Sequence, residues 1–129
     1  MKKERLEYPD IAPAGSTYTR AVRAGNLLFI SGCTARGSDA QGGPALEQLR
    51  ETLGRVVRIV EAEGGVAQDI TKLTTFVTRI GDWYPPTEEQ EALFAGYFGG
   101  QNPANSLIEI SALAQPGLEI EIEAIAVLD

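Results

Sequence analysis

The stretch from Leu118 to Leu128, near the end of the chain, alternates between two kinds of side chain. Every second residue is apolar, while the residues between them begin as glutamates and end as Ile125 and Val127. Successive side chains of a β-strand point to opposite faces, so this alternation predicts a strand with one face against a buried core. We expect the following residues to face that core: Leu118, Ile120, Ile122, Ala124, Ala126 and Leu128.

Two helices are predicted upstream of this strand. Apolar residues recur at helical spacing between Pro44 and Gly64, where a pair of glycines stops the pattern. A second helix is expected to begin after Thr87, a residue type that caps helices, and to end at Gly99. Further strands are predicted at residues 18–22, 27–31, 70–79 and 106–111, whereas residues 1–16 and 32–44 read as irregular.

The resulting order, ββαβαββ, contains two strand–helix–strand units in a short chain. Such units, with right-handed crossovers, imply an α+β sandwich in which one sheet carries both helices on a single face. The chain has 129 residues, 43% of them apolar, and no linker or internal repeat. We therefore expect one domain over residues 1–129.

The helix-free face of the sheet is expected to be covered as well. The strand from Leu27 to Ile30 is apolar on both faces, and the last strand ends with Ile125 and Val127 on its outer face. Because large apolar patches are rarely left in water, a second subunit is the natural cover. A cleft where subunits meet would then be lined by glutamates of the last strand and by strand ends such as Gly32 and Cys33.

Composition argues against several function classes. The chain has no histidine and one cysteine, which removes the usual general base, the usual metal ligand and any internal disulfide. Its formal charge of −7 makes nucleic acid a poor partner, and no glycine-rich phosphate loop points to a nucleotide. No stretch is apolar enough to span a membrane and no signal segment begins the chain, so we expect a cytoplasmic protein.

Short motifs in register with these elements are shared with one known family. They are Tyr18 with the following hairpin, Ile30-Ser31-Gly32, the strand that starts at Thr71, Tyr97-Phe98-Gly99, Pro103-Ala104-Asn105-Ser106 and the ending from Glu121 to Val127. On these motifs the chain resembles, over nearly its whole length, the Rid family of reactive intermediate deaminases, also called YjgF or endoribonuclease L-PSP proteins.

The resemblance implies a chorismate-mutase-like α+β fold and a homotrimer with three clefts between neighbouring subunits. It also implies hydrolysis of short-lived enamines and imines to a keto acid and ammonia, with no metal and no organic cofactor. Carried over position by position, it places these groups in the cleft: Tyr18, the backbone around Ser31 and Gly32, Ala104, Asn105 and Glu121. Cys33 and Arg20 are added as neighbours of these positions on the same strands.

The chain also departs from the family pattern. The deaminase branch has an arginine that grips the substrate carboxylate, and Asn105 stands in its place. Leu107 replaces a frequent cysteine, and Glu91 aligns with an expected asparagine. Losing one partner of a desolvated charge pair typically costs roughly 2–5 kcal/mol. Arg20 and Arg36 are candidate substitutes for the missing cation, against the plainer interpretation that both pair with the acidic surface.

Glu121 is the candidate catalytic residue. Imine hydrolysis needs water to add to carbon, and a carboxylate that holds and deprotonates the water suffices. The plainer interpretation is a solvated strand glutamate. Cys33 could act as a nucleophile, but no histidine activates it, and a small apolar filler is the simpler role. Trp83, Tyr84 and Phe94 could either wall a pocket for a flat substrate or belong to the core.

We therefore expect a cofactor-independent hydrolase of the Rid type that acts on an enamine or imine, an aminomuconate-like acid being one example. The alternative is a non-catalytic trimer that uses the same clefts to bind or protect a small molecule. Ribonuclease activity, which an older family name suggests, fits poorly with an acidic chain that lacks histidine.

Overall fold

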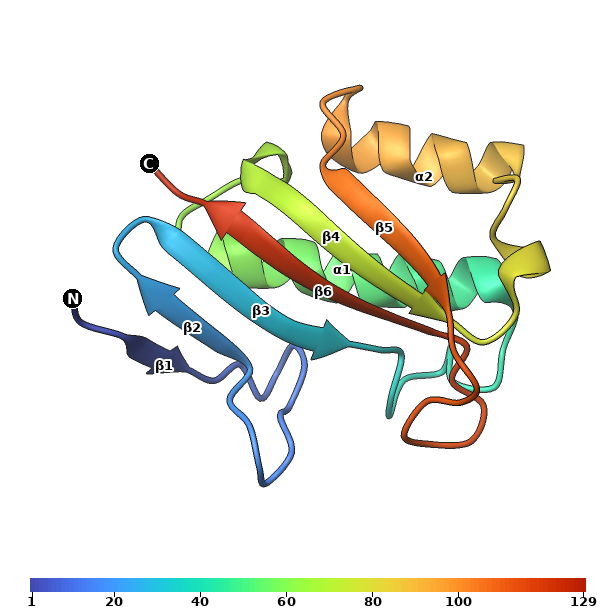
Figure 1. Cartoon of the computed structure of the whole chain (residues 1–129), viewed down its shortest axis with the longest axis horizontal. Helices are drawn as coiled ribbons and strands as arrows, with labels where there is room; N and C mark the ends of the chain where they lie inside the picture. The colour runs from blue at the N-terminus through green and yellow to red at the C-terminus, as the bar shows by residue number, and fades with distance from the viewer.

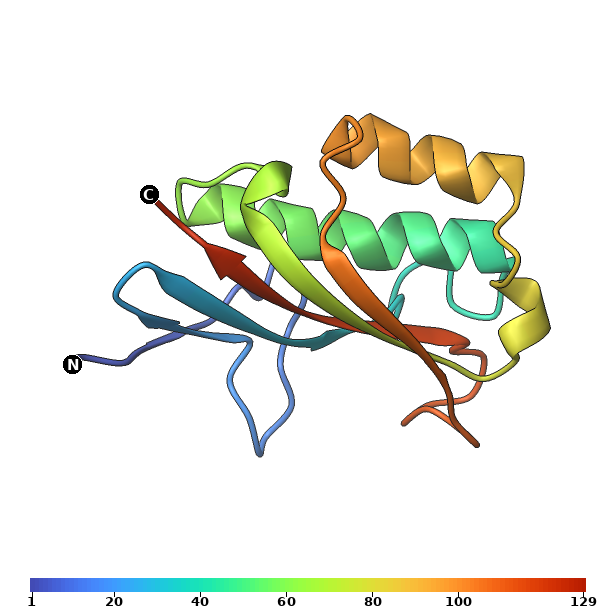
Figure 2. The same ribbon diagram turned by 45° about the horizontal axis from the view of Figure 1, so that its top comes forward.

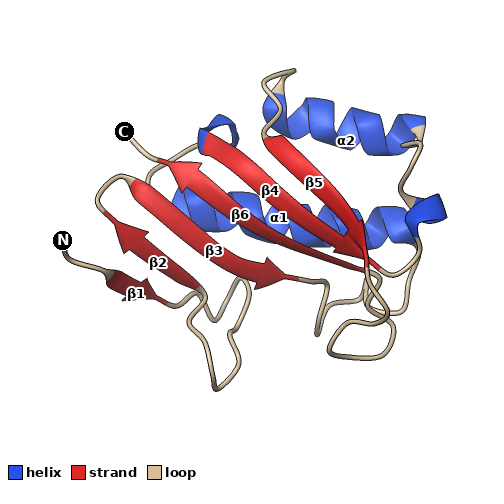
Figure 3. Cartoon of the chain, viewed as in Figure 1, coloured by secondary structure: helices blue, strands red, loops and turns tan.

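A mixed six-stranded β-sheet forms the centre of the structure, a computed structural model that describes all 129 residues (Figure 1, Figure 3). Its strands are β1 (Glu4–Leu6), β2 (Ala21–Ala24), β3 (Leu27–Cys33), β4 (Ile70–Val77), β5 (Ala104–Glu109) and β6 (Ile120–Val127). They lie in the order β1-β2-β3-β6-β4-β5. The neighbours β4 and β5 run parallel, as the helical crossover between them requires, and the other neighbours are antiparallel.

Both helices, α1 (Ala45–Ala62) and α2 (Glu88–Phe98), lie on the same face of the sheet (Figure 2). The Thr87 hydroxyl accepts a hydrogen bond from the Gln90 amide at 3.1 Å, and Gly99 ends α2 with a φ of 58°. The two helices and the α+β class are therefore confirmed. Two single 3₁₀ turns, η1 (Ala67–Asp69) and η2 (Ile80–Asp82), flank β4. No helix is both long enough and apolar enough to cross a membrane.

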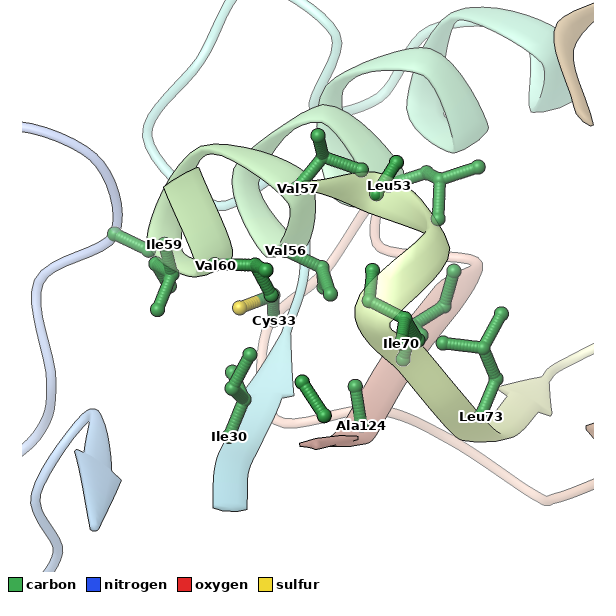
Figure 4. Packing of buried hydrophobic residues seen from close by; sticks show 14 of the residues in the cluster. Ile30, Cys33, Leu53, Val56, Val57, Ile59, Val60, Ile70, Leu73 and Ala124 are labelled. Atoms are coloured by element: carbon green, nitrogen blue, oxygen red, sulfur yellow. The ribbon is translucent and has the colours of Figure 1, made fainter. Parts of the chain in front are cut away.

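The core lies between this sheet face and the helices. All six residues of the last strand and its flanks that were expected to face inward are buried. Side chains of α1 such as Leu53 and Val56 pack on them together with Ile30 of β3 and Leu73 of β4 (Figure 4). Cys33 also belongs to this cluster and is 1% exposed. The alternation in the sequence thus predicts the face of β6 correctly.

Several boundaries differ from the sequence-based expectation, among them the end of β3, which extends through Gly32 and Cys33, and the end of β4, which stops at Val77. Residues 4–6, expected to be irregular, form β1 by pairing with β2. The strand expected at 18–22 is instead Ala21–Ala24, which pairs with residues 27–30 of β3. The turn that joins the two strands passes through Gly25, whose φ is 63°. The strand expected from 106 begins at Ala104, since its parallel pairing with β4 starts at Lys72.

The helix-free face of the sheet, called the open face below, carries large apolar side chains. Its most exposed members are Leu27, Phe29, Ile108 and Val127, which are 37–42% exposed. Phe29 pairs with Ile125 across β3 and β6, and Leu27 pairs with Val127. An exposed apolar surface of this kind is typical of a contact with another chain. Its cover by a second subunit stays a prediction.

Candidate active site

Glu121 projects from the open face of β6, where it lies opposite Phe76 of β4. Its carboxyl group rests on the backbone of β3 at Gly32. A methyl group at residue 32 would lie 2.6 Å from Glu121 Cδ and 2.7 Å from Oε2. Such distances are shorter than real Cβ atoms allow, so a glycine at this position is what lets the carboxyl lie there.

The surroundings of Glu121 favour its protonated form more than water does. Partial burial raises the pKa of this carboxyl, and the nearby negative charge of Glu123 raises it further, while the positive charge of Arg20 acts in the opposite direction. A raised pKa makes the carboxylate a stronger base and brings its titration closer to neutral pH, which suits a group that accepts and returns a proton. Glu121 therefore has the electrostatic setting of an acid–base group.

Arg20 lies beside this carboxyl but is almost completely buried, at 3% exposure. Its Nε donates to the Ala12 carbonyl at 2.9 Å, and Nη2 donates to the Pro13 carbonyl at 3.0 Å. Nη1 donates to the carbonyls of Ser31 and Gly32 at 3.2 and 2.9 Å. The guanidinium therefore ties residues 12 and 13 to the end of β3, and most of its donors are already used.

A small cavity of about 60 Å³ adjoins Glu121. Its lining includes several residues predicted from the sequence, namely Tyr18, Arg20, Gly32, Cys33 and Arg36. The Tyr18 ring is half-exposed and lies 5.5 Å from Arg20 Cζ. The volume is sufficient for one or two water molecules. The structure thus brings this part of the predicted site together around the carboxyl group.

Ser31 and Cys33 occupy the irregular end of β3. The register with β6 shifts between Ile30 and Cys33, and Cys33 pairs with Ile122, so its side chain lies on the helix side. Burial raises the pKa of the Cys33 thiol, which disfavours the nucleophilic thiolate. The Ser31 hydroxyl donates to the Thr19 carbonyl at 2.7 Å. The Ser31 hydroxyl is thus engaged by the backbone of residue 19, and the Cys33 thiol is buried at the edge of the Glu121 cavity.

Asn105 does not lie near the Glu121 cavity. It stands on the edge strand β5 in register with the buried Leu73, so it points to the helix side of the sheet. Its Oδ1 accepts a hydrogen bond from the Thr75 hydroxyl at 3.0 Å. Ala104, one residue earlier, is in register with Lys72 on the open face. Within one chain, therefore, Glu121 and Asn105 occupy opposite faces of the sheet and share no cavity.

A second cavity, of about 460 Å³, lies beside Asn105 between α2 and the sheet. The aromatic side chains of Trp83, Tyr84 and Phe94 line it together with Glu91 and Leu107. Trp83 belongs both to this wall and to the core cluster, whereas Tyr84 is 69% exposed. Both interpretations of the aromatic residues, as pocket wall and as core, therefore hold for Trp83.

Sequence reasoning missed Arg55 and Thr75. Arg55 lies on the buried side of α1, where its guanidinium donates to the carbonyls of Thr34 and Arg36 at 2.7 and 3.0 Å and lines the Glu121 cavity. Its signal was an arginine within the apolar periodicity of α1. Thr75 gave no signal, because its contact with Asn105 depends on the pairing of β4 with β5. Nowhere do three side chains gather that could hold a metal ion.

Comparison with known proteins agrees with the motifs. The sequence profile of the family described as endoribonuclease L-PSP matches residues 10–128. The chain is 36% identical over 119 residues to a 2-iminobutanoate/2-iminopropanoate deaminase of Escherichia coli, covering 90% of this chain and 91% of that protein. It is 35% identical over 112 residues to a RutC family protein of Pyrococcus horikoshii, covering 84% and 85% of the two chains.

Solved structures show the same fold. The crystal structure of a putative endoribonuclease from Thermotoga maritima has a TM-score of 0.82, with 32% identity and 98% of each chain covered. A protein of unknown function from Pseudomonas aeruginosa has a TM-score of 0.84 and 31% identity, covering 99% of this chain and 94% of that chain. The chain therefore belongs to the endoribonuclease L-PSP family, which is the Rid or YjgF family that its motifs resemble.

Proposed function

We propose that the protein hydrolyses imines or enamines of small metabolites without a cofactor, in clefts formed between copies of the chain. The observation that carries this proposal is the half-buried Glu121 carboxyl group, held over Gly32 beside a cavity for water. The raised pKa of this carboxyl suits proton transfer in both directions. A relative with 36% identity is named a 2-iminobutanoate/2-iminopropanoate deaminase.

The reaction needs one acid–base group. Glu121 accepts a proton from water while the water oxygen forms a bond to the carbon of the protonated imine. The protonated Glu121 then transfers that proton to the amino nitrogen of the carbinolamine. The C–N bond breaks and ammonia leaves, while the Glu121 carboxylate accepts the hydroxyl proton as the carbonyl group forms and then passes it to the released ammonia. For an enamine, proton addition to its carbon–carbon double bond precedes these steps.

Two copies of the chain are needed to complete the cleft. The Glu121 cavity holds only about 60 Å³, which is too little for a metabolite, whereas the Asn105 cavity holds about 460 Å³ but does not include Glu121. The exposed apolar residues of the open face favour contact with another copy. In a homotrimer, each cleft would join Glu121 of one copy to the β5 edge of its neighbour.

A second candidate is a non-catalytic binding protein with the same clefts. The observation that favours it is Asn105, because an amide there cannot neutralise a substrate carboxylate as arginine does. The two candidates differ in one respect: only the hydrolase accelerates the loss of ammonia from an imine.

The test compares the wild type with Glu121→Gln. Imines are generated in place by a flavin-dependent amine or amino-acid oxidase, and trapping by semicarbazide reports how long each imine survives. The wild type should shorten the lifetime of at least one imine, and Glu121→Gln should lower kcat by roughly 10²–10⁴. No acceleration on any imine supports the binding protein, and an active Glu121→Gln variant rejects the mechanism.

A further inference from the structure

The cavity between α2 and the sheet has the size and the walls of a small-molecule site. Its volume of about 460 Å³ lies within the range of ligand pockets. Trp83, Tyr84 and Phe94 present aromatic surface, and Leu107 adds an aliphatic wall from β5. Aromatic walls of this kind bind flat apolar groups. The apolar part of a ligand therefore fits between these side chains.

The only charged side chain that lines this cavity is Glu91. Positions 80–129, which supply α2, β5 and β6, contain no lysine and no arginine. The nearest basic residue of the neighbouring strand, Lys72, is in register with Ala104 on the open face, where its Nζ contacts the Ser106 hydroxyl at 2.9 Å. The cavity therefore offers a negative charge and no positive one.

Asn105 supplies a neutral contact in the same cavity. Because its Oδ1 accepts from the Thr75 hydroxyl, its amide NH₂ group remains the part that can face a ligand. An amide can donate to a neutral nitrogen or oxygen, but it does not neutralise a carboxylate. A carboxylate in this cavity would also face the charge of Glu91, and like charges disfavour binding.

We propose that this cavity selects imines without a carboxylate group, holding a flat apolar body between its aromatic side chains, with a positively charged end toward Glu91 or a neutral acceptor toward Asn105. This rests on the proposed function for its use in hydrolysis, but the preference in binding can be measured without turnover. The substrate class is then the imine of an apolar amine rather than a 2-imino acid.

The competing source of a cation is Arg36. Arg20 and Arg55 donate to several main-chain carbonyls, whereas Arg36 makes one such bond, from Nη2 to the Pro13 carbonyl at 2.6 Å. Arg36 lines the Glu121 cavity and not the Asn105 cavity. If it reached across an assembled cleft to a substrate carboxylate, anionic ligands would bind well and Arg36→Ala would abolish that binding.

The binding test uses Trp83, the only tryptophan of the chain, whose fluorescence reports on the cavity. The probes share one body and differ in charge: 3-phenylpropylamine, 3-phenylpropanamide and 3-phenylpropanoate. We expect the anion to bind at least about tenfold more weakly than the cation, with the amide between them. Glu91→Gln should reduce this difference, whereas Glu89→Gln, an equal loss of charge on the same helix outside the cavity, should not. Asn105→Arg should reverse the order.

Equal or tighter binding of the anion would overturn the proposal, and so would the absence of binding by all three probes. A second experiment, which measures hydrolysis, distinguishes a wrong substrate class from a wrong proposed function. The imine of 2-phenylethylamine and the imine of phenylalanine differ by one carboxylate, and the wild type should accelerate hydrolysis of the first at least about tenfold more. Acceleration of both with preference for the second rejects the substrate class and keeps the hydrolase. Acceleration of neither rejects the hydrolase, and the probe titration alone then decides the binding preference.

Discussion

Glu121 and Asn105 point to opposite faces of the same sheet. Glu121 of β6 is in register with Phe76 on the open face, and Asn105 of β5 is in register with the buried Leu73 on the helix side. The two residues that the family motifs place in one cleft therefore do not meet within a chain. The proposed function therefore depends on a second copy of the chain.

The contact of Gly32 with Glu121 predicts the effect of adding one methyl group. In Gly32→Ala, the new Cβ would displace the Glu121 carboxyl from β3, and we expect kcat to fall about 10–100-fold. Gly81→Ala is the control, because nothing lies near the Cβ there. Combining Gly32→Ala with Glu121→Gln should cost no more than Glu121→Gln alone. Additive losses would show that Gly32 acts independently of the carboxyl group.

The raised pKa of Glu121 predicts how stability depends on pH. Burial penalises the ionised carboxylate in the folded state. The contribution of Glu121 to the free energy of unfolding is therefore greatest below the pKa that this group has in the unfolded chain, and it is lost as the pH rises through the folded-state pKa. Glu121→Gln should therefore unfold at a higher urea concentration than the wild type at pH 7. This difference in urea midpoint between the variant and the wild type should disappear as the pH falls toward about 4.

The pH dependence of wild-type activity should also reflect the titration of Glu121. Because the base form of Glu121 activates water, kcat/KM should fall on the acid side with a midpoint above the usual glutamate pKa of about 4.3. Glu89→Gln removes an exposed carboxylate from α2. It should show no pH-dependent gain in urea midpoint over the wild type, and it should leave the acid midpoint of kcat/KM unchanged. A wild type more stable than Glu121→Gln at pH 7 would contradict the electrostatic account.

Arg20 and Arg36 should differ sharply in their effect on folding. Arg20→Met leaves buried carbonyls at the end of β3 without their donors and should lower the free energy of unfolding by about 2–4 kcal/mol. Arg36→Met removes one hydrogen bond, to the Pro13 carbonyl, and should cost about 1 kcal/mol or less. Urea titration measures both. Equal costs would mean that the carbonyl contacts of Arg20 are not what holds residues 12 and 13 in place.

The open face should be the contact surface between copies. Phe29 is 42% exposed there, and a charge at this position would be buried by a second copy at high cost. Wild-type protein should scatter light as about three times the chain mass of 13.8 kDa, and Phe29→Glu should scatter as smaller species. Val66→Glu, at an exposed apolar residue on the helix side, is the control. A wild-type monomer at micromolar concentration would refute the shared clefts.

Local signals predicted the helices and the inner face of β6. Thr87 with Gln90 and Gly99 mark both ends of α2 by capping chemistry, which acts within a few residues. The strand β1 gave no such signal, because Glu4 and Arg5 are charged and the strand exists through its pairing with β2.

The sequence predicts a residue of the candidate site only where its position follows from the pattern of a single strand. The alternation and the closing motif together single out Glu121, and the structure places it beside Gly32 as expected. The burial of Arg20 depends on carbonyls from two separate segments of the chain, residues 12–13 and residues 31–32, so its position in the sequence gave no indication of it. The side to which Asn105 points depends on which strand pairs with β5, and a sequence pattern does not contain that pairing.

Complementation between two inactive variants tests the shared cleft most directly. Glu121→Gln removes the acid–base group, and Ala95→Trp fills the Asn105 cavity from the exposed side of α2. Each variant alone should be inactive on an imine that the wild type hydrolyses. When equal amounts are unfolded and refolded together, about a quarter of the clefts should receive Glu121 from one variant and an open cavity from the other. Recovery of about a quarter of the wild-type activity is the predicted result, whereas a refolded mixture that stays inactive would show that Glu121 and the Asn105 cavity do not work across two copies.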